Sequence, residues 1–171
     1  MKPRFALDQN FPTPIIQALR SSIVEVELAP VFAIDRRLSE LDDWELLLAL
    51  HHHPDRYDGL ITTDSSMLSQ ARELAVLMQT RLTLVVAQAA GHDPVRATGL
   101  VLTHLPQIAK MTRPDKAQIW SLSARTPAAD DPWVVLGTVA SRAKTTARAL
   151  YAAQKLDPAT LARDPLASVP G

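Results

Sequence analysis

Short apolar runs alternate with helical segments through the first 122 residues of this 171-residue chain. The runs lie at residues 5–7, 24–28, 58–62, 82–87 and 119–122. They are brief and bounded by turn-forming residues, which favours strands over helices. Because right-handed crossovers place helices on both faces of a sheet, the alternation predicts a three-layer α/β/α fold. Its centre would be a mainly parallel sheet of about five strands.

Helical segments fill the gaps between these runs. Pro12 and Pro14 suit the start of a helix, where a missing N–H costs nothing. Ser39, with Asp42 three residues further on, is the expected capping pair of the next helix. Residues 46–50 of that helix are apolar on every side, so we expect it to be buried.

Two longer helices are expected after the third and fourth apolar runs. Asp64 offers an N-cap for a helix that carries apolar residues at helical spacing as far as Met78. The second helix would cover residues 95–111, with an interruption at Pro106. Residues 133–136 are a further candidate strand.

The chain changes character after Thr138. Residues 140–155 are rich in alanine, arginine and lysine and predict a helix, whereas residues 157–171 are punctuated by proline and predict a flexible tail. We therefore expect one α/β domain over residues 1–138 and a C-terminal helical extension over residues 139–171.

Composition excludes several functional classes. Cysteine is absent, which rules out disulfides, thiolate zinc sites and cysteine nucleophiles. Lysine and arginine together number 18, as do aspartate and glutamate, so no global field draws the chain to nucleic acid. No stretch approaches the roughly 18 apolar residues of a membrane span, and a cytoplasmic protein with no membrane association is the expectation.

Three carboxylates occupy corresponding places in the expected fold. Asp8 follows the first strand, Asp64 follows the third, and Asp43 lies in the first turns of the helix between the second and third. Ligands of an open parallel sheet gather at the carboxyl ends of its strands. Acids brought together there would repel one another unless a cation neutralised them, and an all-oxygen set suits Mg²⁺ or Mn²⁺. Such an ion lowers the pKa of bound water and holds a phosphate for in-line attack.

Each acid also has a simpler interpretation. Asp64 is a natural N-cap, Asp8 can form a turn into the following helix, and Asp43 can complement a helix dipole. The occurrence of all three at corresponding positions favours the metal site. Histidines 51–53 lack the facial spacing of metal ligands and suit a helix C-terminus.

Three short motifs carry a resemblance to a known family. They are Leu7-Asp8-Gln9-Asn10-Phe11-Pro12, Leu41-Asp42-Asp43-Trp44-Glu45-Leu46-Leu47 and Ile61-Thr62-Thr63-Asp64. In order and spacing, roughly over residues 2–122, the chain resembles the PIN-like nucleases, in particular the compact branch whose first strand ends in Asp-x-Asn followed by proline.

The resemblance implies a metal-dependent ribonuclease, several relatives being toxins of toxin–antitoxin pairs. It implies that Asp8, Asp43 and Asp64 are the catalytic, metal-binding acids and that Asn10 is an auxiliary group, with Asp42 as the alternative to Asp43. PIN nucleases often carry a fourth acid near the end of the fourth strand or in the next helix. Residues 82–90 contain none, and Asp93 is the nearest candidate.

Polar and basic residues around these acids have two interpretations each. Thr63 and Ser65, beside Asp64, suit either a phosphate or a helix cap. Arg36 and Arg37 are candidates for an RNA-binding rim or for ordinary solvated surface. Trp44 suits either a stacked base or the core.

Three functions follow as expectations. The first is a PIN-like endoribonuclease that hydrolyses RNA phosphodiesters with Mg²⁺ or Mn²⁺, with an antitoxin protein as a partner. The second is a non-catalytic PIN-like module that binds RNA or a partner protein. The third is a receiver-like phosphoacceptor domain, although Asp8-Gln9 is not an acidic pair and no lysine closely follows residues 82–87. Homodimer formation is left open.

Overall fold

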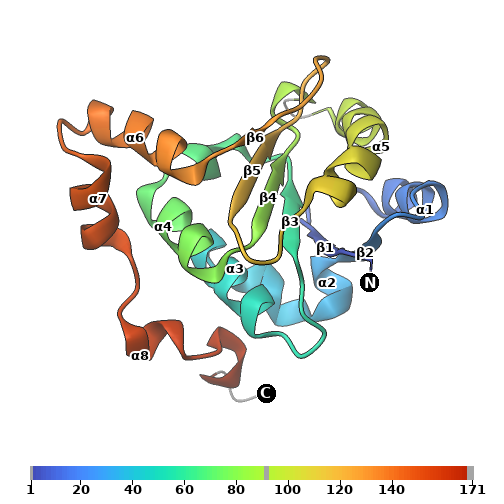
Figure 1. The fold of residues 1–171 in the computed structure, drawn as a ribbon. Helices are drawn as coiled ribbons and strands as arrows, with labels where there is room; N and C mark the ends of the chain where they lie inside the picture. The colour runs from blue at the N-terminus through green and yellow to red at the C-terminus, as the bar shows by residue number, and fades with distance from the viewer. Residues whose placement is uncertain (1, 91–92, 169–171) are drawn as a thin grey trace.

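The central sheet of the computed structural model is six-stranded within the described residues, which are 2–90 and 93–168. Its order is β2-β1-β3-β4-β5-β6 (Figure 1). The strands are β1 (Arg4–Leu7), β2 (Glu27–Pro30), β3 (Gly59–Thr62), β4 (Thr83–Val86), β5 (Gln118–Ser121) and β6 (Ala129–Asp130). Strands β1 to β5 pair in parallel, and β6 runs antiparallel to β5. The mainly parallel α/β fold is confirmed, with one strand more than expected.

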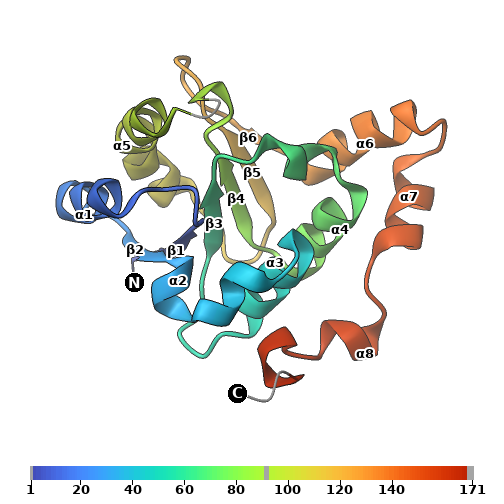
Figure 2. The ribbon, with the colours of Figure 1, turned by 180° about the vertical axis from the view of Figure 1, so that it is seen from behind.

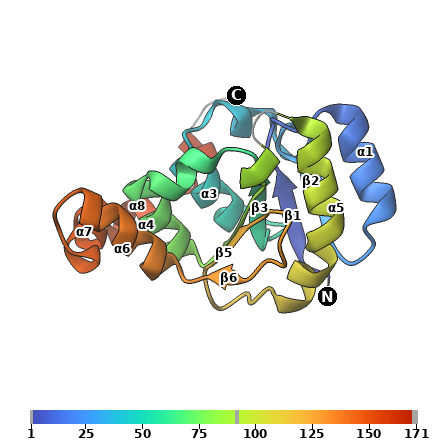
Figure 3. The same cartoon turned by 90° about the horizontal axis from the view of Figure 1, so that it is seen from above.

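Helices cover both faces of the sheet. Helices α1 (Thr13–Ser22) and α5 (Pro94–Met111) lie on one face, and α3 (Asp43–His52) and α4 (Ala71–Thr80) lie on the other (Figures 1 and 3). Within the described part of the chain, no helix has the length and apolar character needed to cross a membrane.

Alternate residues of each strand pack into two separate cores, because successive side chains of a strand point to opposite faces of the sheet. Ala6, Leu60 and Leu84 pack with the α3 and α4 side, whereas Phe5 and Ile61 pack with the α1 and α5 side. Both sets are almost completely buried. The expected all-apolar segment of α3, residues 46–50, is buried as predicted.

Gly59 at the start of β3 has no room for a side chain. A Cβ there would fall on the carbonyl oxygen of Thr83 and on the ring of Phe5. The absence of a side chain at this position lets β3 and β4 pair while Phe5 fills the core.

Several expected boundaries are wrong. The second strand is β2, three residues later than expected, because residues 27–30 are the ones in register with β1. The segment after it contains α2 (Val31–Ile34) and the 3-10 helix η1 (Arg36–Glu40).

Helix α3 is capped differently from the prediction. Ser39 lies inside η1, and Asp42 is itself the N-cap, with its backbone N–H donating to Glu45 Oε2 at 3.2 Å. The helix expected after Asp64 is broken into η2 (Ser65–Ser69) and α4, whereas α5 continues through Pro106.

The predicted strand at residues 133–136 is helical. These residues belong to α6 (Pro132–Arg142), because Asp131 accepts a hydrogen bond from the Trp133 N–H at 2.9 Å and Pro132 occupies the first turn. The single helix predicted over residues 140–155 is divided between α6 and α7 (Ala147–Gln154). The boundary expected at residue 138 lies inside α6.

The C-terminal segment packs on the domain instead of forming a flexible tail. It includes α8 (Pro158–Leu161) and η4 (Pro165–Ser168), which lie on the α3 and α4 side of the sheet (Figure 2). Leu156 and Leu166 are buried in the core on that side. Gln79 Nε2 donates to the carbonyl of Leu156 at 2.9 Å, and His52 Nε2 lies 2.8 Å from the carbonyl of Leu161. The last three residues of the predicted tail, 169–171, lie outside the described residues.

Candidate functional site

The order of the strands determines where a ligand site is expected. From β1 the chain crosses to β2 on one side, and from β2 it returns to β3 on the other side of β1. In open α/β sheets, ligands bind outside the carboxyl ends of the strands at such a reversal. Asp8 directly follows β1 and Asp64 closely follows β3, so both lie at the reversal. The Asp8 N–H donates to the carbonyl of Ile61 at 2.9 Å, which joins the two strand ends.

The Thr62 side chain connects the two acids. Its hydroxyl, which is fully buried, donates to Asp8 Oδ2 at 2.8 Å and accepts from the Asp64 N–H at 3.0 Å. Asn10 Nδ2 also donates to Asp8 Oδ2, at 3.1 Å, and the Gln9 N–H donates to Asp8 Oδ1 at 2.7 Å. The Asp8 carboxylate is therefore held in one orientation. Asn10 thus lies beside Asp8, and its auxiliary role stays a prediction.

Asp64 performs the capping role that its sequence context allows. Its Oδ1 accepts from the Ser66 N–H at 2.8 Å and caps η2. This cap uses one of the two carboxylate oxygens. Capping and ligand binding are therefore compatible at this residue.

Asp43, the first residue of α3, is half-buried, and its pKa is raised from 3.8 to about 6. Burial is the main cause, followed by the negative charges of Asp64, Asp8, Glu73 and Asp42. The N-terminus of a helix should stabilise a carboxylate, but here desolvation and repulsion outweigh the dipole. The three predicted acids thus lie near enough to one another to interact.

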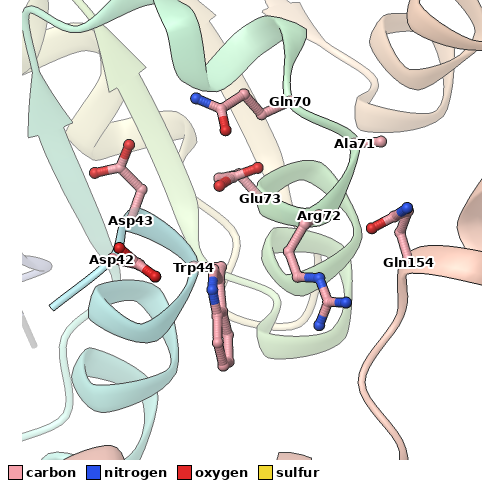
Figure 4. Close-up of a pocket in the computed structure, with 8 residues that line it drawn as sticks. All are labelled: Asp42, Asp43, Trp44, Gln70, Ala71, Arg72, Glu73 and Gln154. Atoms are coloured by element: carbon pink, nitrogen blue, oxygen red, sulfur yellow. The ribbon is translucent and has the colours of Figure 1, made fainter.

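A pocket of about 590 Å³ opens between the N-terminal ends of α3 and α4 (Figure 4). Asp43, Glu73 and Gln70 line one part of it, and Trp44 and Arg72 line another. The Arg72 guanidinium lies 5.6 Å from the centre of the Trp44 ring. Trp44 is thus partly buried against an arginine and also lines the pocket. This position is intermediate between the two predicted for it, a core residue and a residue that stacks on a base.

Glu73 is the residue that sequence reasoning missed. Its side chain is only 8% exposed, and Oε2 is buried with no hydrogen-bond partner. A signal was available, since Glu73 precedes Val76, Leu77 and Thr80 by three, four and seven residues and therefore shares their buried face.

A second pocket, of about 490 Å³, lies at the carboxyl ends of the strands. Asn10, Thr63, Asp64 and Ser65 line it, so the predicted auxiliary residues share one cavity with a predicted acid. Asp93 also lines it while capping α5 through the Val95 N–H, at 2.9 Å.

The predicted arginines lie elsewhere. Arg37 pairs with Asp35 at 2.7 Å, lowers the pKa of that carboxyl through the hydrogen bond, and donates to the carbonyl of Leu166 at 3.1 Å. It therefore ties the C-terminal segment to the domain. Arg36 is exposed in η1, and neither residue lines the two pockets described above.

The donor chemistry fits a hard divalent cation, although the described carboxylates are not gathered into a ready cage. Across residues 2–90 and 93–168, no group of three or more His, Cys, Asp or Glu side chains is placed to hold a metal ion. The acids here offer only oxygen, and a cation would relieve both the repulsion at Asp43 and the unpartnered oxygen of Glu73.

Comparisons with known proteins identify no relative of this chain. No family model matches it, and neither a curated protein nor a solved structure does.

Proposed function

We propose that the protein is a PIN-like endoribonuclease that hydrolyses RNA phosphodiesters with Mg²⁺ or Mn²⁺ held by Asp8, Asp43 and Asp64. One observation carries the proposal. The charges of Asp8 and Asp64, at the reversal of strand order, act on Asp43 and help raise its pKa to about 6. Carboxylates that lie close together and raise one another's pKa are typical of functional sites.

The residues of the chain would orient both ion and substrate. A divalent cation, when bound, supplies activated water and neutralises phosphate charge. Thr62 and Asn10 hold the Asp8 carboxylate, and the Ser66 N–H holds that of Asp64. Thr63 and Ser65 line the 490 Å³ pocket, where their hydroxyls would bind phosphate oxygens.

The test is hydrolysis of single-stranded RNA in Mg²⁺ or Mn²⁺ by the wild type, Asp8→Asn and Asp115→Asn. Asp115 is an exposed acid far along the chain and serves as the matched control. Asp8→Asn should abolish cleavage and Asp115→Asn should not. Equal activity of the wild type and Asp8→Asn would refute the assignment.

A non-catalytic PIN-like module that binds RNA or a partner protein is the second candidate. It is favoured by the finding that, among the described residues, no group of three or more His, Cys, Asp or Glu side chains is placed to hold a metal ion. This candidate predicts weak or absent Mn²⁺ binding in calorimetry, and tight binding would argue against it.

If the proposed nuclease is a toxin, it has an antitoxin protein as its partner. A small reading frame next to its gene would be the first evidence for that partner.

A receiver-like phosphoacceptor is the third candidate, and the topology gives it a specific argument. The parallel order β2-β1-β3-β4-β5 is shared with flavodoxin-like folds, and Asp64 closely follows their third strand position. The residues that follow β5, 122–128, contain no lysine to complete such a site. Labelling with acetyl phosphate that leaves Asp64 unmodified would dismiss this candidate.

A further inference from the structure

The buried carboxylate of Glu73 has one oxygen without a hydrogen-bond partner. Glu73 is the third residue of α4, more than nine-tenths buried, and its Oε2 makes no hydrogen bond. A buried carboxylate oxygen without a donor is costly. In native proteins such an atom calls for an explanation, of which a bound ion is one.

The arginine that lines the same pocket is directed at an aromatic ring. Arg72, the preceding residue, places its guanidinium against the Trp44 ring. In Figure 4 Arg72 and Trp44 lie on one side of the pocket, while the carboxylates of Glu73 and Asp43 lie on the other. Asp43 and Glu73 are near enough for their charges to interact.

A third oxygen is available beside this pair. Gln70 Nε2 donates to Ser66 Oγ at 3.4 Å, which turns the amide oxygen away from Ser66. Figure 4 shows the Gln70 side chain on the same side of the pocket as Asp43 and Glu73. An amide oxygen and two carboxylates on the same side of one pocket match the ligand chemistry of a hard divalent cation.

We infer that Asp43, Glu73 and the amide oxygen of Gln70 form a divalent-cation position between α3 and α4, distinct from the position faced by Asp8 and Asp64. Asp43 lies between the two positions and contributes to both. The inference concerns cation binding alone and goes beyond the proposed nuclease, because it holds whether or not RNA is cleaved. Mg²⁺, Mn²⁺ and Ca²⁺ share the ligand preference, and Mn²⁺ is a convenient probe.

The experiment measures Mn²⁺ binding by calorimetry and by electron paramagnetic resonance at pH 7.5. The proteins are the wild type, Glu73→Gln, Asp8→Asn and the exposed control Glu40→Gln. Glu73→Gln should weaken one class of Mn²⁺ site at least tenfold. Asp8→Asn should leave that class intact, and Glu40→Gln should match the wild type.

Thermal unfolding separates a lost ligand from a damaged fold. In EDTA, Glu73→Gln should melt no lower than the wild type, because the change replaces a carboxylate that has one buried oxygen without a hydrogen-bond partner. In Mn²⁺, the wild type should gain more in Tm than the variant. Gln70→Ala, at an exposed position, should weaken the same site and gives a second variant if Glu73→Gln does not fold.

Two results would overturn the inference. One is Mn²⁺ binding by Glu73→Gln equal to that of the wild type. The other is loss of one and the same ion in both Glu73→Gln and Asp8→Asn, which would mean a single position. Absence of RNA cleavage by the wild type would refute the proposed nuclease and leave these binding results unaffected.

Discussion

Replacing Asp43 by asparagine should stabilise the protein at neutral pH when no divalent cation is present. The folded protein raises the pKa of Asp43 from 3.8 to about 6. At ~1.36 kcal/mol for each pH unit this rise amounts to ~3 kcal/mol, and solvent screening of the half-buried carboxylate reduces it to about 1–2 kcal/mol. Asparagine carries no charge and avoids this cost.

The pH dependence has a definite sign. Between pH 3.8 and about 6 the folded protein binds more protons at Asp43 than the unfolded chain does. The free energy of unfolding contributed by this group therefore falls as pH rises through that window and levels off above it. The advantage of Asp43→Asn should be complete at pH 7.5 and about a third as large at pH 4.5.

Urea unfolding followed by circular dichroism, in EDTA at pH 4.5 and 7.5, measures this difference. Asp115→Asn is the control and should differ from the wild type by less than about 0.5 kcal/mol at either pH. An Asp43→Asn advantage that is equal at both pH values, or a variant less stable than the wild type at pH 7.5, would refute the electrostatic reasoning.

Four further substitutions test the fold in the same urea assay. Thr62→Val removes the hydroxyl between Asp8 and the Asp64 N–H and should cost about 1–3 kcal/mol; a loss within error would show that the bridge is unimportant. Gly59→Ala should cost more than about 3 kcal/mol because its Cβ meets backbone, whereas Gly99→Ala, in open space on α5, should stabilise by about 0.5–1 kcal/mol. Leu156→Ala should cost about 2–4 kcal/mol, and an unchanged midpoint would mean that the C-terminal segment is not part of the folded core.

Local sequence patterns were sufficient to predict those elements of the fold for which a pattern had only one structural explanation. The continuous apolar residues of β3 and β4 and of α3 identified buried elements, and the positions of Asp8 and Asp64 after strands followed from them. Whether these acids bind a metal stays a prediction.

The elements and the site residue that were not predicted from the sequence depend on contacts between distant segments or on neighbouring residues. Residues 133–136 are a short apolar run that suits a strand or a helix, and only the preceding Asp131-Pro132 decides for the helix. The start of β2 is set by its pairing with β1. The spacing within α4 shows only that the Glu73 side chain shares the buried face of the helix. Its position near Asp43 depends on the packing of α3 against α4, which the sequence does not show.

Both edges of the sheet are poor templates for another strand. Strand β6 covers only Ala129–Asp130, and β2, on the opposite edge, carries the exposed charge of Glu27 and ends in Pro30, which has no N–H to donate. Short edges, charge and proline are the features that prevent sheets from joining edge to edge. The chain is thereby protected from aggregation through strand addition, and two copies that form a dimer would have to meet through their helices and loops.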